Sequence, residues 1–161
     1  MRGRLAAIPP HHDPLCFGCG QTGPGLKLQL PQIEGGDSYC SPVVFREEHQ
    51  GGPGLVHGGI VGAALDEACG LLATWCRFPA VTARFTIRFR KPVPIKQALE
   101  VSARVTGRRG RRLEIAGELR NADEVLAESA GTFLHVPLDH FLATAEGQAA
   151  RDAWRQRTGV E

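Results

Sequence analysis

The stretch HGGIVGAALDEACGLLATW, residues 57–75, has the length and the period of one helix. Its apolar residues recur at the spacing of a single helical face, at Ile60, Ala64, Ala68, Leu71, Leu72 and Trp75. The opposite face carries the small residues Gly62, Cys69 and Ala73, where a surface helix would carry charges. We therefore expect a helix buried on all sides, its apolar stripe against its own sheet and its small face toward a pocket and a partner subunit.

One carboxylate, Asp66, lies among the small residues of this helix. A buried carboxylate without a partner costs several kcal/mol, so Asp66 needs either a structural partner, such as an arginine, or a chemical role. The next residue, Glu67, falls at the edge of the apolar stripe. We expect Glu67 to contact a neighbouring loop, and we keep it as a second candidate for acid–base chemistry.

Length and composition indicate one globular domain. The chain has 161 residues, 42% of them hydrophobic and 22% charged, and a formal net charge of +2. This charge gives no reason to expect nucleic acid as a partner. We find no run of 18 apolar residues and only a short apolar run at the start, so we expect no membrane association and a cytoplasmic location. Five cysteines, an odd number, argue against a complete disulfide framework.

The segment before the helix contains a C-x-x-C pair in Cys16-Phe17-Gly18-Cys19-Gly20. Such a pair can be half of a zinc site, a redox pair or a structural loop of small residues. A tetrahedral zinc site needs four ligands and no second C-x-x-C follows, although His11, His12 and Cys40 could complete one. We favour the structural loop and expect no metal. Residues 1–15 are expected to form an extended arm.

Alternation of apolar and polar residues predicts the strands. Before the helix we expect strands at 25–30 and 39–46, separated from the helix by a Gly/Pro loop at 49–56. After it, residues 81–90 form the clearest strand, with Phe85 and Ile87 on one face and Thr82 with the arginines on the other. Three further strands follow at about 99–105, 113–119 and 125–136, and residues 146–157 have helical composition. The order predicts an α+β fold with the helix against one antiparallel sheet.

The motifs together resemble the acyl-CoA thioesterases of the PaaI-like, 4-hydroxybenzoyl-CoA thioesterase superfamily. The features that carry this resemblance are His57-Gly58-Gly59 with Asp66 nine residues after the histidine, the strings 53–59 and 65–67, the C-x-x-C loop, Gly25-Leu26, and residues 81–83 and 90–94. The resemblance implies the hotdog fold, a long central helix wrapped by a curved antiparallel sheet of five to six strands. It covers a domain at 16–137 and leaves 138–161 as a C-terminal tail, expected to be helical.

The same resemblance implies roles for particular residues. Asp66 would be the catalytic carboxylate, as general base on water or as nucleophile, and Thr82 would help hold the water. His57, Gly58 and Gly59 would lie at the helix start, where backbone N–H groups polarise the thioester carbonyl. The family's sites lie between two subunits, with Asp66 from one and the HGG loop from the other. We therefore expect a homodimer, possibly a tetramer, and no metal or redox cofactor.

Elementary chemistry agrees with these roles. Thioester hydrolysis needs a base or a nucleophile and donors aimed at the developing oxyanion, and a helix N-terminus supplies such donors. Gln50, or His49 beside it, is expected either to contact substrate or to face solvent. A basic set is expected either to meet the phosphates of coenzyme A or to form a solvated surface. This set comprises Arg88, Arg90, Lys91, Arg108 and Arg109.

The sequence thus predicts an acyl-CoA thioesterase. A non-catalytic hotdog module that binds an acyl-CoA or acyl group would use the same helix and pocket and is the alternative. A hotdog dehydratase or hydratase ranks third, because that chemistry usually needs a catalytic histidine at a different spacing.

Overall fold

The computed structural model describes residues 13–29 and 36–158. Most of the expected N-terminal arm, with His11 and His12, lies outside the described residues, as does Leu30 at the end of the first expected strand.

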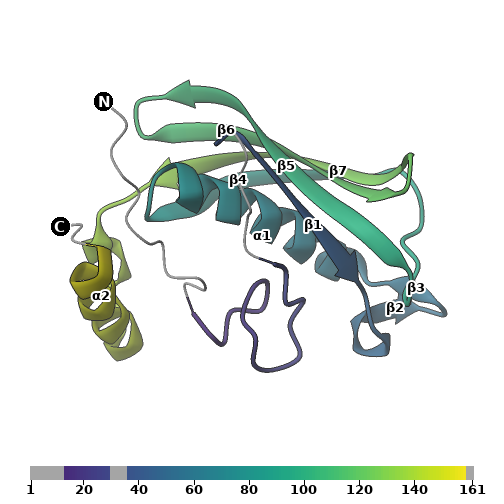
Figure 1. Cartoon of the computed structure of the whole chain (residues 1–161), viewed down its shortest axis with the longest axis horizontal. Helices are drawn as coiled ribbons and strands as arrows, with labels where there is room; N and C mark the ends of the chain where they lie inside the picture. The colour runs from purple at the N-terminus through teal and green to yellow at the C-terminus, as the bar shows by residue number, and fades with distance from the viewer. Residues whose placement is uncertain (1–12, 30–35, 159–161) are drawn as a thin grey trace.

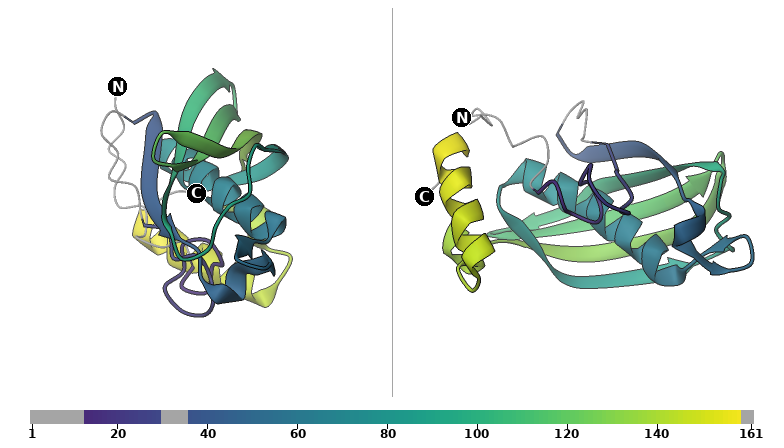
Figure 2. Two further views of the ribbon diagram at one scale, coloured as in Figure 1. Left: turned by 90° about the vertical axis from the view of Figure 1, so that its right-hand side faces the viewer. Right: turned by 90° about the horizontal axis from the view of Figure 1, so that it is seen from below.

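The core is a five-stranded antiparallel sheet with one long helix along it. The sheet has the order β1-β5-β6-β7-β4, and the helix α1 spans Gly58–Cys76. The strands are β1 Ser38–Val44, β4 Ala80–Phe89, β5 Ala98–Arg109, β6 Arg112–Asn121 and β7 Glu124–His135. Figures 1 and 2 show α1 lying along one face of this curved sheet, which confirms the expected α+β architecture.

The start of α1 is fixed by His57. Its backbone is extended, with φ −60° and ψ 134°, and its ring Nδ1 accepts a hydrogen bond from the Gly59 N–H at 3.0 Å. His57 is therefore the N-cap, a role more often filled by Ser, Thr, Asp or Asn. By length and composition α1 is long and apolar enough to cross a membrane, as the core helix of a folded domain can be. Here α1 packs against all five strands of the sheet.

The small face of α1 points to the sheet, so its expected orientation toward a pocket and a partner subunit is wrong. A Cβ on Gly62 would lie 2.9 Å from Cδ1 of Ile87 on β4. A Cβ on Gly117 of β6 would lie 3.0 Å from Sγ of Cys69. The helix therefore approaches the concave side of the sheet closely, and only small side chains fit between them.

The side of α1 away from the sheet is covered by residues 13–29, as Figures 1 and 2 show. Leu26 and Leu28 are buried there in the same apolar cluster as Leu71. The strand expected at 25–30 is not formed over residues 25–29. Lys27 has a φ of 57°, which no β-ladder accommodates, and the N–H groups of Leu26 and Leu28 donate to the carbonyls of Phe17 and Gly18. The alternation predicted burial correctly but not hydrogen bonding.

Smaller elements lie at the two ends of α1. The expected Gly/Pro loop contains a short hairpin, β2 Gln50–Gly52 with β3 Leu55–Val56, after the 3₁₀ turn η1 Glu47–His49. At the other end, η2 Leu138–Phe141 and α2 Ala145–Thr158 follow β7, and α2 confirms the helix expected in the tail. Trp154 of α2 packs in a second apolar cluster with Phe78 and Leu138.

Candidate active site

Asp66 and Thr82 meet directly. The Thr82 Oγ1 hydroxyl donates to Oδ1 of Asp66 at 2.9 Å, joining the middle of α1 to the start of β4. Asp66 is half-buried, whereas Thr82 is exposed. The Thr82 hydroxyl thus binds only one of the two carboxylate oxygens of Asp66, and Oδ2 is not bound by Thr82.

A β-bulge brings Thr82 to this position. The pairing of β4 with β7 shifts between Thr82 and Arg84, so that Ala83 is the extra residue. Thr82 pairs with the buried Phe133 and therefore faces α1, as Phe85 does beyond the bulge. The expectation that Thr82 shares the outer face with the arginines is wrong, because the bulge reverses the alternation of the strand.

Burial raises the pKa of the Asp66 carboxyl above its ordinary value, and the hydrogen bond from Thr82 opposes that rise. A carboxylate with a raised pKa is a stronger base than a solvated aspartate. The environment of Asp66 thus suits proton abstraction.

A cavity of about 260 Å³ opens beside the two residues. Its walls come from α1, the start of β4, β7, η2 and α2. Apart from Asp66, Glu67, Thr74 and Thr82, the lining is apolar, and it includes four aromatic rings, of Phe78, Phe133, Phe141 and Trp154. Sequence reasoning did not place any of these rings at the site. Phe141 and Trp154 lie in the tail, which no motif tied to Asp66.

Glu67 faces a different neighbour from Asp66. Its Oε2 lies 3.7 Å from the Sγ of Cys16, so the carboxylate contacts the C-x-x-C loop, as expected. Glu67 also lines the cavity. The two adjacent carboxylates therefore have separate partners, a hydroxyl for Asp66 and a thiol for Glu67.

The HGG end of α1 is distant from Asp66 within one chain. Asp66 lies eight positions after Gly58, which corresponds to about 12 Å of helix. The Gly59 N–H already donates to His57. The Gly58 N–H, at the first position of α1, makes no hydrogen bond within residues 13–29 and 36–158 and is therefore the available amide. One chain does not bring HGG and Asp66 to a common point.

The residues just before HGG have structural contacts. The side-chain oxygen of Gln50 accepts from the Gly54 N–H at 2.8 Å, which closes the β2–β3 turn. His49, expected in contact with substrate or solvent, is instead 2% exposed, and its Nδ1 accepts from the Arg46 N–H. Gln50 remains exposed.

The expected basic set divides into two groups. Arg112 begins β6 just after the turn that follows Arg108 and Arg109, and it is level with Val81. Arg88 lies seven residues further along β4, about 20 Å away. One chain therefore does not gather the five side chains into one phosphate site, because the two groups lie at opposite ends of the strands.

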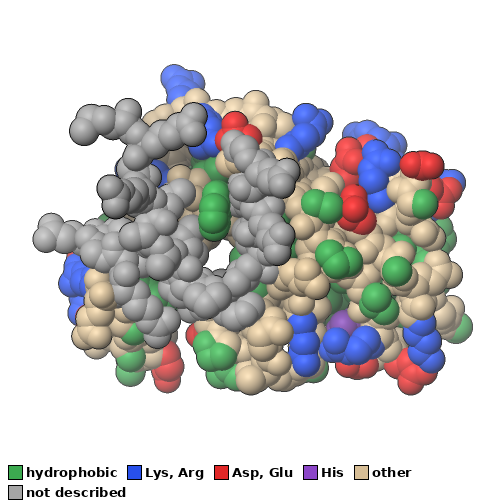
Figure 3. Space-filling model, viewed as in Figure 1, with side chains coloured by type: hydrophobic (Ala, Val, Ile, Leu, Met, Phe, Trp, Pro, Cys, Tyr) green, Lys and Arg blue, Asp and Glu red, His purple; other side chains and the backbone are tan. Residues whose placement is uncertain are grey.

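Several of these cations have acidic partners. Arg90 pairs with Glu128 at 2.7 Å, and Lys91 contacts Glu124. At the other end Arg108 contacts Asp37, whereas Arg88 lines a groove on the outer face of the sheet. Figure 3 shows basic and acidic side chains interspersed over the right-hand end of the molecule. Such exposed pairs are worth little energetically and can exchange for a ligand phosphate.

Comparison of the chain with known protein families agrees with this geometry. The model of the thioesterase superfamily matches residues 53–128, which contain HGG, Asp66 and Thr82. Over this segment, which is just under half of its length, the chain is similar to the thioesterase superfamily. Its fold, a central helix wrapped by a five-stranded antiparallel sheet, is the hotdog fold of that superfamily.

Individual proteins that are similar to this chain agree with the family comparison. The acyl-coenzyme A thioesterase THEM4 of Bos taurus is 35% identical over 91 residues, which are 56% of this chain and 37% of THEM4. The solved thioesterase superfamily protein RHA08564 is 30% identical, with a TM-score of 0.62 over 66% of this chain and 55% of that one. The PaaI protein of E. coli has the same fold, with a TM-score of 0.63 at 19% identity over 69% of this chain and 80% of PaaI. The chain thus spans little more than a third of the length of THEM4.

Proposed function

We propose that this chain hydrolyses an acyl-CoA to the free acid and coenzyme A. The observation that carries the proposal is a half-buried carboxylate, Asp66, held by the Thr82 hydroxyl at the mouth of an apolar cavity. The name of THEM4, an acyl-coenzyme A thioesterase, supports the substrate class. The aromatic walls of the cavity suit an apolar acyl group, and Asp66 supplies the polar group that the reaction needs.

In the general-base route, Asp66 takes a proton from a water molecule as that water attacks the thioester carbonyl carbon. The tetrahedral oxyanion then collapses, the C–S bond breaks, and the coenzyme A thiolate receives the proton. In the nucleophilic route the carboxylate attacks the carbonyl carbon and the C–S bond breaks, which releases the coenzyme A thiolate. Water then cleaves the resulting anhydride to the free acid and the Asp66 carboxylate. Both routes use the ionised form of Asp66.

The oxyanion needs donors, and we propose that they come from the HGG end of a second copy of the chain. The 12 Å between Gly58 and Asp66 in one chain supports a shared site. The edge strand β4 ends at Phe89, which is 55% exposed and borders Gly58. An exposed edge with an exposed aromatic ring favours pairing with a second copy. Arg88, Arg90 and Lys91, at this same end, are our candidates for the coenzyme A phosphates.

A panel of short, medium, long and aromatic acyl-CoAs tests the activity. We expect release of free thiol, detected by a chromogenic disulfide reagent, with at least one acyl class. Saturable binding without thiol release across the panel would contradict hydrolysis and favour the non-catalytic acyl-binding module.

Replacing Thr82 by Val should change the pH dependence. The hydroxyl lowers the pKa of Asp66, so its loss lets burial raise that pKa further. Because hydrolysis needs ionised Asp66, the acid limb of the kcat/KM profile should move to higher pH, with roughly a tenfold loss on that limb. Thr86→Val is the matched control, since Thr86 lies on the same strand but lines the outer groove. An acid limb at the same pH in Thr82→Val and in the wild type would contradict an effect of the Thr82 hydrogen bond on Asp66.

Replacing Trp154 by Ala should broaden the acyl preference. The Trp154 ring lies 5.4 Å from the ring of Phe78 and 5.3 Å from that of Phe141, both at 87°, and forms part of the cavity wall. Its removal enlarges the cavity, so kcat/KM for longer acyl-CoAs should rise relative to short ones by roughly tenfold. The control is Arg155→Ala on the same helix, whose side chain is exposed. An unchanged chain-length profile would remove α2 from the acyl site.

A further inference from the structure

Two thiols and a carboxylate converge beside the candidate site. The Sγ atoms of Cys16 and Cys19 and a carboxylate oxygen of Glu67 all lie within 4.8 Å of one another. The loop that carries the cysteines is tightly wound, since the Gly20 N–H donates to the Cys16 carbonyl at 2.9 Å. Gly18 lies directly on Glu67, because a Cβ there would be 2.2 Å from the Glu67 Cγ. The loop is thus built around this carboxylate.

One atom of this group lacks a partner. Oε1 of Glu67 is buried, and no hydrogen bond satisfies it among the described residues, while Oε2 contacts Cys16. A buried carboxylate oxygen without a donor costs free energy comparable to a lost charged hydrogen bond. The proposed hydrolysis assigns proton abstraction to Asp66 and gives this oxygen no role, and a bound cation would satisfy it.

The donor set has the chemistry of a zinc site. Two thiolates at C-x-x-C spacing and a carboxylate are ligands that Zn²⁺ accepts, and three protein ligands leave one of four tetrahedral positions for water. Although the sequence led us to expect no metal, we propose that the chain binds one Zn²⁺ through Cys16 Sγ, Cys19 Sγ and the Glu67 carboxylate. The site fixes the loop to the turn of α1 that also carries Asp66, its neighbour in sequence.

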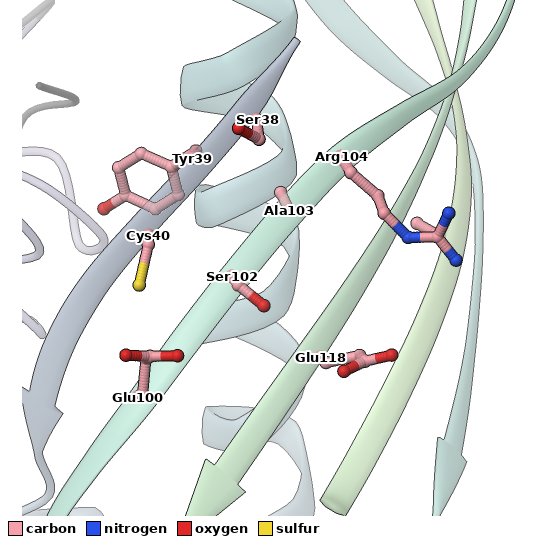
Figure 4. Close-up of a pocket in the computed structure, with 9 residues that line it drawn as sticks. Ser38, Tyr39, Cys40, Glu100, Ser102, Ala103, Arg104 and Glu118 are labelled. Atoms are coloured by element: carbon pink, nitrogen blue, oxygen red, sulfur yellow. The ribbon is translucent and has the colours of Figure 1, made fainter. Parts of the chain in front are cut away.

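Among the residues that the structure describes, Cys40 does not join this group. Cys40, which could have completed a zinc site by sequence, lies beside Glu100 on the outer face of β1 and β5 and borders a groove of about 480 Å³ there (Figure 4). A bound metal ion displaces the protons of the thiols that ligate it.

The test uses Zn²⁺ and Co²⁺ on the full chain. After incubation with Zn²⁺ and dialysis, elemental analysis should give one zinc per chain, and Co²⁺ should give thiolate-to-cobalt charge-transfer bands. Zn²⁺ should also raise the Tm, because it binds only the folded chain. Cys16→Ser, Cys19→Ser and Glu67→Gln should each weaken binding by more than about 100-fold, since even outer-sphere changes cost 10- to 100-fold.

Two controls make the result specific. Cys40→Ser and Asp66→Asn should bind Zn²⁺ as the wild type does, because neither residue belongs to the ligand set. The proposal is overturned by substoichiometric zinc in reduced protein, by cobalt spectra without thiolate bands, or by unchanged affinity in Glu67→Gln. The metal test and the hydrolysis test are independent, since an inactive Asp66→Asn chain should still hold its metal.

Discussion

Asp66→Asn is expected to lower kcat/KM for every acyl-CoA that the wild type cleaves by roughly 1,000-fold, the middle of the range for removing a positioned base. Asparagine keeps the shape of the side chain and can still accept from Thr82, but it cannot take a proton or form an anhydride. Thiol release under matched substrate concentrations measures the loss. Retention of full hydrolysis would remove Asp66 from the chemistry.

Stability should move in the opposite direction to activity in this variant. Burial raises the pKa of Asp66, so the folded chain binds that proton more tightly than the unfolded chain. The associated stability is present at low pH and is lost as the pH rises through the folded-state pKa. At neutral pH the ionised carboxylate therefore costs stability, and Asp66→Asn should have a Tm no lower than the wild type.

Two comparisons separate catalysis from general damage. Asp123→Asn, in the exposed β6–β7 turn, removes the same charge far from the cavity and should leave kcat/KM unchanged. Glu67→Gln tests the adjacent carboxylate. A loss as large as that of Asp66→Asn would assign the chemistry to the pair, whereas a smaller loss would leave Glu67 with the C-x-x-C loop.

Much of the fold could be predicted because its signals are local. The period of residues 57–75 identified α1, and alternation identified all five strands of the main sheet. The orientation of α1 could not be predicted, because it depends on how closely a curved sheet approaches Gly62 and Cys69. The hydrogen bonds of residues 25–29 were likewise missed, since the positive φ of Lys27 has no signature in the residue itself.

The sequence predicted which residues form the site better than it predicted how their side chains are arranged. The spacing from His57 selected Asp66, and the motif after the helix selected Thr82. Their contact depends on a register shift near Ala83, and strict alternation put Thr82 on the wrong face. The C-x-x-C motif drew attention to Cys16. The sequence could not show that Cys16 contacts Glu67, because the two residues lie 51 positions apart and meet only in the folded chain.

Mixing two inactive variants should restore activity if each site draws on two chains. The second variant is Gly58→Pro, which removes the N–H that we propose as oxyanion donor. Proline suits this position, since Gly58 is the first residue of α1 and His57 before it is already extended at ψ 134°. The variant should fold normally and lose roughly 100- to 1,000-fold in kcat, the cost of one oxyanion donor.

In a random mixture of Asp66→Asn and Gly58→Pro chains, half of the dimers are heterodimers. In each of these, one site combines the intact Asp66 of one chain with the intact Gly58 of the other, and the second site lacks both. Activity should therefore return to about a quarter of the wild-type value after subunit exchange, from almost none in either parent. If both groups came from one chain, every site would carry one defect. Mixing would then yield only the mean of the parents, and heterodimers verified by native mass spectrometry without restored activity would rule out the shared site.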